Sequence, residues 1–114
     1  MQAVQFSEHG ETDVIEYGEF PDPEPAADEV LFDVKAAALN HLDVWTRRGL
    51  PIIDLEFPHI PGSDAAGVVR AVGEDVQRFE PGDHAAVSAG VNCGHCEFCR
   101  DGDPTLCVDY HVIG

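Results

Sequence analysis

Short runs of apolar and β-branched residues recur along the chain and are separated by Gly and Pro. Such runs, bounded by turn-forming residues, are typical of strands. The segment 29–38 begins with alternating apolar and polar residues, the pattern of a half-buried strand, and 65–72 contains three valines flanked by glycines. Strands are therefore predicted over 3–6, 14–17, 29–38, 65–72 and 83–89.

One short helix is predicted over His41–Arg48, because its residues tolerate helical geometry and Gly49 and Pro51 follow it. The stretch 20–25 contains three prolines and is predicted to be a loop, since proline suits neither a β-ladder nor a helix interior. Many short strands with Gly- and Pro-rich turns favour a mainly β fold, either a barrel or a sandwich. With 114 residues, the chain has room for a single domain, 1–114.

Acidic residues dominate the charge of the chain. Asp and Glu number 22 against six Lys and Arg, the net charge is −16, and Lys35 is the only lysine. A charge of this size opposes compaction unless salt screens it. We therefore expect a halophilic source with a high-salt cytoplasm. Nucleic acid is not expected as a partner, because no basic patch would neutralise its phosphates.

The sequence carries no sign of a membrane or secreted location. No apolar run approaches the ~20 residues that span a bilayer. Residues 1–6 lack the basic region and apolar stretch of a signal peptide. We therefore expect a cytoplasmic protein without a membrane partner.

All four cysteines fall in one polar segment, at Cys93, Cys96, Cys99 and Cys107. Four thiolates suit a closed tetrahedral zinc site with no open position for substrate. Because the segment has no convincing apolar pattern, metal binding would have to supply its order. The spacing thus predicts a structural zinc.

Other uses of these cysteines stay open at this point. Disulfides are rare in a cytoplasmic protein, and a redox CxxC pair needs no third and fourth cysteine. An iron–sulfur cluster shares the C-x2-C-x2-C run, but its next spacing is three residues, followed by proline, whereas here the spacing is seven and Val108 follows. His95 and His111 lie nearby but are not needed once four cysteines fill a zinc.

Four stretches in the same order resemble the medium-chain alcohol dehydrogenase family. They are the four-cysteine spacing, the segment 37–43 (AALNHLD), the segment 58–69 (PHIPGSDAAGVV) and the segment 72–85, with its VG and later F-x-PGDHA. Together they cover most of the chain beyond residue 29. The resemblance implies the GroES-like domain of that family, a partly open β-barrel with short helices and a structural-zinc lobe.

The chain departs from zinc-dependent members of this family where they bind a catalytic zinc. There the first ligand is a cysteine, and the second is a histidine followed by glutamate; here Asn40, Ser63 and Asp64 occupy these positions. Leu42 replaces a hydroxyl residue of the proton relay. Asn and Ser offer no thiolate, imidazole or carboxylate. The resemblance therefore implies no catalytic zinc, as in the quinone-oxidoreductase-like and enoyl-reductase-like branches.

Those branches carry Asn at the first position, where it reaches the nicotinamide ribose or the substrate. Asn40 is therefore the candidate catalytic and cofactor-binding residue, with an amide that both donates and accepts. Capping of the following helix is the competing interpretation, since Asn is a preferred N-cap residue. His41 is a candidate general acid, and Asp43 is a candidate to orient His41 or Arg47.

A rebuilt second metal site is a further interpretation of the same region. Asp64, His41 and His59 are ligand types that zinc accepts, and their separation in sequence does not forbid convergence. Such a site would restore metal chemistry where the family ligands are missing.

The resemblance implies an NAD(P)-dependent oxidoreductase acting on an alcohol, an aldehyde or ketone, a quinone or an activated alkene. The chain contains no G-x-G-x-x-G and leaves no room for a nucleotide-binding domain. We therefore expect an N-terminal domain that is incomplete at its C-terminal end and inactive alone. The alternative is a non-enzymatic, zinc-stabilised β-domain that binds a partner or itself. An unfinished strand edge favours a homo-oligomer in either case.

Overall fold

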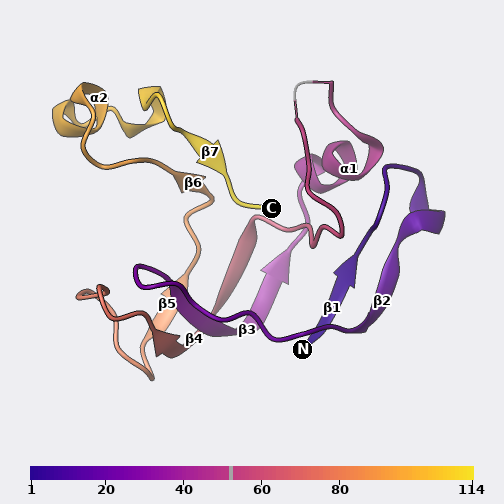
Figure 1. Cartoon of the computed structure of the whole chain (residues 1–114), viewed down its shortest axis with the longest axis horizontal. Helices are drawn as coiled ribbons and strands as arrows, with labels where there is room; N and C mark the ends of the chain where they lie inside the picture. Colours follow the sequence, from indigo (N-terminus) through magenta and orange to yellow (C-terminus); the bar gives the residue numbers. More distant parts are fainter. Residues whose placement is uncertain (52) are drawn as a thin grey trace.

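The computed structural model describes residues 1–51 and 53–114, and its strands form three small antiparallel sheets (Figure 1). β1 pairs with β2, β3 with β4, β4 with β5, and β6 with β7. The bounds of the strands are Gln2–Gln5 (β1), Glu16–Glu19 (β2), Val30–Ala38 (β3), Asp64–Val72 (β4), His84–Ala86 (β5), Gly90–Val91 (β6) and His111–Val112 (β7).

The sheet β3–β4–β5 lies in the middle of the molecule and connects its other parts (Figure 1). β3 and β4 pair along their whole length, so that Ala38 lies opposite Asp64 at one end. Gly67 lies where the two backbones approach closely, because a Cβ there would be 2.0 Å from the carbonyl oxygen of Asp33. Val69 of β4 is 2% exposed and belongs to the small apolar core.

The hairpin of β1 and β2, with the 3-10 helix η1 (Thr12–Val14) between its strands, precedes the central sheet. Phe6 follows β1 directly and is 1% exposed. The backbone N–H of Phe6 donates to the carbonyl of His59 at 3.0 Å, and the N–H of His59 donates back at 2.9 Å. This isolated bridge attaches the hairpin to the segment that leads into β4.

α1 (His41–Arg48) connects the end of β3 to that segment and has defined signals at both ends. Asn40 is its N-cap, and the Asp43 carboxylate accepts a hydrogen bond from the Asn40 backbone N–H at 2.7 Å, as in a capping box. Gly49 ends the helix with φ +91°, a conformation that favours glycine.

α1 buries a charged residue against the hairpin connection. Arg47 is 8% exposed, and its guanidinium donates to the carbonyl oxygen of Gly10 at 2.5 Å. The carbonyl oxygen of Arg47 accepts in turn from the Gly10 N–H at 3.1 Å. Arg48, by contrast, is exposed and pairs with Glu11 at 3.0 Å. Arg47 therefore ties α1 to the N-terminal part of the chain.

A lobe protrudes beyond the central sheet, on the side away from the β1–β2 hairpin (Figure 1). It contains the short ladder of β6 and β7, the helix α2 (Glu97–Asp101) and the 3-10 helix η2 (Pro104–Leu106). Gly102 ends α2 in the left-handed conformation, with φ +90°. Pro104 stands at the start of η2, where its missing N–H is no loss.

The predicted mainly β architecture with a short helix agrees with these elements, and α1 has the predicted bounds. Two strand predictions were wrong in their bounds: the strand predicted over 14–17 lies two residues later, at Glu16–Glu19, and the one predicted over 83–89 is shorter. Val14 belongs to η1, and β5 ends at Ala86, although the N–H of Val87 still donates to the carbonyl of Ala65. No helix among the described residues is long and apolar enough to cross a membrane.

Candidate functional site

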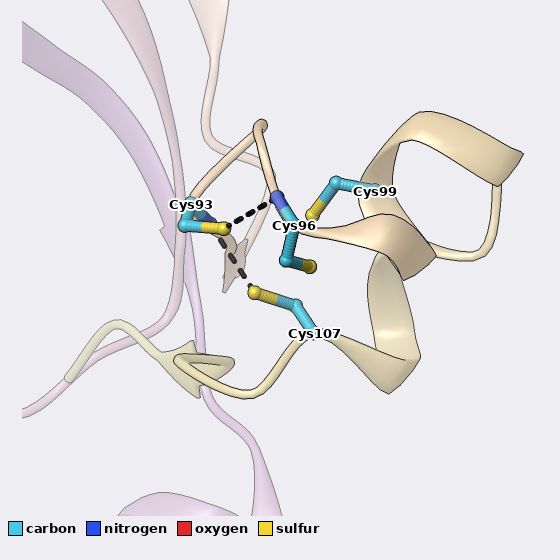
Figure 2. A group of neighbouring side chains, drawn as sticks. All are labelled: Cys93, Cys96, Cys99 and Cys107. Carbon is cyan, nitrogen blue, oxygen red and sulfur yellow. Dashed lines mark hydrogen bonds between the residues drawn. The ribbon is translucent and has the colours of Figure 1, made fainter.

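The four cysteines converge in the lobe, as Figure 2 shows, although they come from separate local elements. Cys93 follows β6, Cys96 is the N-cap of α2, Cys99 lies within α2, and Cys107 follows η2. Their four sulfur atoms all lie within 4.8 Å of one another. Zn–S bonds of ~2.3 Å require sulfur separations of about 3.8 Å in a tetrahedron, so a small contraction brings them into range.

Backbone N–H groups point at these sulfur atoms. The N–H of Cys96 donates to Cys93 Sγ at 3.3 Å, and the N–H of Cys93 donates to Cys107 Sγ at 3.3 Å (Figure 2). The N–H of Asp109 also donates to Cys107 Sγ, at 3.4 Å. Such donors favour the thiolate over the thiol and orient the sulfur atoms, as partners around a metal centre do.

The thiols of this cluster differ in acidity because they share one small space. A hydrogen bond from the backbone N–H of Cys99 is the main cause that lowers the pKa of Cys96 to about 7, and one from that of His95 lowers the pKa of Cys93. Desolvation, together with the neighbouring sulfur of Cys96, raises the pKa of Cys99 to about 12. A divalent cation stabilises every thiolate that coordinates it, so a bound cation would allow all four thiols to be deprotonated together.

The donor set therefore fits a closed four-sulfur site for an ion such as zinc. The two nearby histidines contact backbone carbonyl groups through Nδ1. His95 Nδ1 lies 2.7 Å from the carbonyl oxygen of Cys93, and His111 Nδ1 lies 3.2 Å from the carbonyl oxygen of Asp109. Four sulfur ligands leave no position at which a substrate would coordinate.

A second polar cluster lies where β3 ends and β4 begins. Because Ala38 pairs with Asp64, Asn40 lies just beyond this end of the ladder and meets the start of β4. The Asn40 amide nitrogen donates to Asp64 Oδ2 at 2.8 Å and to Ser63 Oγ at 3.4 Å. Ser63 is 6% exposed. Asn40, the first candidate residue, thus caps α1 and also donates a hydrogen bond to the start of β4.

Asp43 has a different partner from the one expected for it. The Asp43 carboxylate bonds the backbone of Asn40, and no bond from it to His41 or Arg47 is formed among the described residues. The exposed ring of His41 lies against Trp45, with ring centroids 5.4 Å apart. Asp43 is therefore a helix-capping residue, and the interpretation that it orients His41 or Arg47 gains no contact.

The suggested second metal group does not come together. In the described part of the chain, the four cysteines are the only set of three or more His, Cys, Asp or Glu side chains whose ligand atoms converge. Asp64 accepts from Asn40 instead. His59 lies beside Phe6, with ring centroids 5.4 Å apart, and His41 lies on α1 against Trp45.

A cavity of about 470 Å³ lies beside α1 and was not predicted. Leu42 and Thr46, one turn apart on α1, form one wall. The other walls come from the segment after α1 and from the C-terminal residues: Ile53, Leu55, His59, Tyr110, His111, Val112 and Gly114. The sequence signals this cavity only through the i, i+4 spacing of Leu42 and Thr46, which places both on one face of α1. The residues of the other walls are distant from α1 in sequence.

The model of the family described as the alcohol dehydrogenase GroES-like domain matches residues 26–114. The chain belongs to this family. The predicted GroES-like fold is supported by a crystal structure of an NAD-dependent alcohol dehydrogenase, which matches the whole chain with a TM-score of 0.91 and 46% identity. The matched region is 33% of that protein.

Two relatives of known name show the range of the family. Alcohol dehydrogenase 1 of Emericella nidulans is 35% identical over 99 residues, which are 86% of this chain and 28% of that protein. The chloroplastic quinone-oxidoreductase homolog of Spinacia oleracea is 41% identical over 86 residues, which are 73% of this chain and 26% of that protein. The chain thus spans about a quarter to a third of the length of the relatives it matches.

Proposed function

We propose that the chain is the N-terminal domain of an NAD(P)-dependent medium-chain dehydrogenase/reductase with one structural zinc and no catalytic zinc. Its substrate would be a small molecule: an alcohol, an aldehyde or ketone, a quinone or an activated alkene. The observation that carries the proposal is the hydrogen bond from Asn40 to Asp64. Both residues lie in the region that matches the family, at positions where zinc-dependent members are expected to bind a catalytic zinc. The names of the relatives support both the alcohol and the quinone classes.

The structural role of zinc is supported by the composition of the lobe. Its helices are short, and Cys107 is its one fully buried apolar residue among those described. With so little apolar burial, metal coordination would supply most of the free energy that orders the lobe. Bound zinc would act as a cross-link between β6, α2 and η2 and would take no part in the reaction.

The absence of a catalytic zinc is supported by the chemistry at the end of β4. Asn40 and Ser63 are neutral, and the two nearby carboxylates are both engaged by Asn40: Asp64 by its amide and Asp43 by its backbone N–H. Zinc in proteins is held by thiolates, imidazoles and carboxylates, usually three or more of them. A hydrogen-bonding amide at this place would hold a ligand hydroxyl or carbonyl without a Lewis acid.

The dinucleotide cofactor does not fit this chain alone. The described strand pairs are all antiparallel, whereas a dinucleotide-binding domain is built from parallel βαβ units with a Gly-rich turn. We therefore expect the chain to be inactive by itself. In the whole protein, the Asn40 amide would face the reaction site, the cavity beside Leu42 would accept an apolar part of the substrate, and exposed His41 would be available as a proton donor.

A chimera tests this function. The chain would replace the matched third of an NAD-dependent relative. NAD(P)H would be followed as it forms with a panel of alcohols and as it is consumed with a panel of aldehydes, ketones, quinones and enones. We expect turnover by the chimera, none by the isolated chain, and a loss of about tenfold to a hundredfold in Asn40→Ala, the range for removing one hydrogen-bonding partner. Glu97→Gln, an exposed change in the lobe, serves as the control. A chimera that folds, binds the cofactor and turns over no member of the panel would argue for the non-enzymatic alternative.

The acidic composition supports a high-salt setting for the same protein. With a net charge of −16, repulsion between carboxylates would be largest at low ionic strength. We expect the thermal midpoint to rise when KCl is raised from about 0.1 M, where the Debye length is about 10 Å, to molar concentrations. A midpoint that falls or stays constant would count against adaptation to salt.

A further inference from the structure

Four rings from two segments, 6–9 and 57–59, form a cluster that joins the N-terminal hairpin to the rest of the molecule. Phe6 packs against Phe57 and His59, with ring centroids 6.1 and 5.4 Å apart. His9 meets Phe57 edge-on, with centroids 5.1 Å apart. The reciprocal backbone bridge between Phe6 and His59 lies at the centre of this cluster. The hairpin is thus attached where an ionisable ring is packed among aromatic residues.

The surroundings of His59 disfavour its protonated, positively charged form. Its Nε2 atom is buried and has no hydrogen-bond partner among the described residues. Burial, with a smaller contribution from neighbouring His9, holds the pKa of His59 below its ordinary value. A protonated imidazole has two N–H donors, and leaving one of them buried without an acceptor is costly.

We infer that His59 is an acid-sensitive latch, whose protonation releases the β1–β2 hairpin from the segment leading into β4 while the central sheet stays folded. Release lets the protonated Nε2 reach water, which the closed cluster denies to that atom. Because His59 also lines the cavity beside α1, the same event would open one wall of that cavity. The inference concerns regulation of the fold and does not depend on the proposed enzymatic activity.

The charged groups around the latch do not compensate a positive His59. From the hairpin side the nearest ionisable group is His9, whose Nδ1 lies 3.2 Å from the carbonyl oxygen of Arg47 on α1. Glu8, between Phe6 and His9, and Glu56, next to Phe57, are both exposed to solvent. Glu11, further along the hairpin connection, is already shared by Arg47 at 3.9 Å and Arg48 at 3.0 Å. From the C-terminal side, Tyr110 and His111 line the same cavity.

The direction of the pH dependence follows from the lowered pKa. When the hairpin is released, His59 takes up a proton near its ordinary pKa of ~6.5, whereas in the closed cluster it does so only at lower pH. The closed state is therefore fully favoured above about pH 6.5 and loses this advantage as the pH falls towards the pKa in the closed state. Within that window, the opening equilibrium rises by up to about tenfold per pH unit.

Hydrogen exchange on the zinc-loaded full chain tests the latch, at constant high salt and from about pH 8 to about pH 5. The reporters are the bridge amides of Phe6 and His59, compared through protection factors with the amide of Val69 in the central sheet. We expect the protection of the bridge amides, but not that of Val69, to fall as the pH drops. In His59→Phe, which keeps a ring against Phe6, the protection of the Phe6 amide should become independent of pH.

His84→Gln is the matched control, because His84 is an exposed histidine of β5 and should leave the pH dependence unchanged. Equal pH dependence in His59→Phe and in the unaltered chain would overturn the inference, as would bridge protection that does not vary with pH. If His59→Phe does not fold, titration of the His59 ring by NMR in the unaltered chain decides. A midpoint at or above ~6.5 overturns the latch, and a lower midpoint, coincident with loss of bridge protection, supports it.

Discussion

Removing the Arg47 guanidinium should weaken the fold far more than removing that of its neighbour Arg48. Arg47 is 8% exposed and donates to the carbonyl oxygen of Gly10. A hydrogen bond from a charged donor contributes about 1.5–3 kcal/mol, and truncation to Ala also loses two methylenes at about 0.8 kcal/mol each if fully buried. Partial relaxation offsets some of this, so Arg47→Ala should lower the free energy of unfolding by about 2–4 kcal/mol.

Arg48→Ala is the matched control on the next position of α1. Its side chain is 56% exposed and pairs with Glu11, which is 66% exposed. Exposed ion pairs contribute about 0–1 kcal/mol, so this change should have little effect. Arg47→Met, which keeps most of the apolar stem, separates the hydrogen bond from packing and should fall between the two.

Urea unfolding at constant high salt, followed by tryptophan fluorescence of Trp45, measures all three variants. For a domain of about 100 residues, each 1 kcal/mol corresponds to about 4–8 °C in the thermal midpoint, so Arg47→Ala should also melt at least about 8 °C lower. The slope of the urea dependence should stay unchanged if the variants unfold in one step. Equal losses in Arg47→Ala and Arg48→Ala would refute the view that burial of Arg47 ties α1 to the hairpin connection.

Three further changes test other parts of the fold. Gly67→Ala should destabilise by more than about 3 kcal/mol in urea unfolding, because its Cβ would lie 2.0 Å from the carbonyl oxygen of Asp33. Gly18→Ala, whose Cβ would lie 3.9 Å from the Phe20 ring, should change stability by less than about 1 kcal/mol, and a similar cost for both would contradict this packing. A hydrogen bond from the N-terminal ammonium, assisted by Arg70, lowers the pKa of Asp22. Ionised Asp22 therefore stabilises the fold above the unfolded pKa of ~3.9, and this stabilisation is lost as the pH falls through the lower pKa of the folded state. Asp22→Asn should make stability depend less on pH in acid, as melting curves at low salt would reveal.

Local signals in the sequence were sufficient for α1 and the central strands. Asn40 at the N-cap and Gly49 after the last turn delimit α1, and the structure has it within these bounds. The valines of 65–72 lie on β4, where Val69 enters the core. In these elements the information lies within a few residues of where it acts, so pattern alone predicts them.

The lobe and the site contacts depend on residues far apart in sequence, or on a ligand. α2 and η2 carry no amphipathic pattern, and their order comes with the convergence of the four sulfur atoms. Arg47 is buried by Gly10, 37 residues earlier, and Asn40 meets Asp64, 24 residues later. The unpartnered nitrogen of His59 is equally invisible in the sequence, since only the packing against Phe6 creates it.

Metal stoichiometry distinguishes a domain with one structural metal from a domain that also holds a catalytic one. The full chain would be purified in high salt without chelator, analysed for zinc, and reconstituted with Co²⁺ so that the absorption spectrum reports the ligands. We predict about one zinc per chain, a four-thiolate cobalt spectrum, loss of metal and lobe order in Cys99→Ser, and no change in metal content in Asp64→Ala. Two zinc ions per chain, with one lost in Asp64→Ala, would show that a second metal site exists at the start of β4.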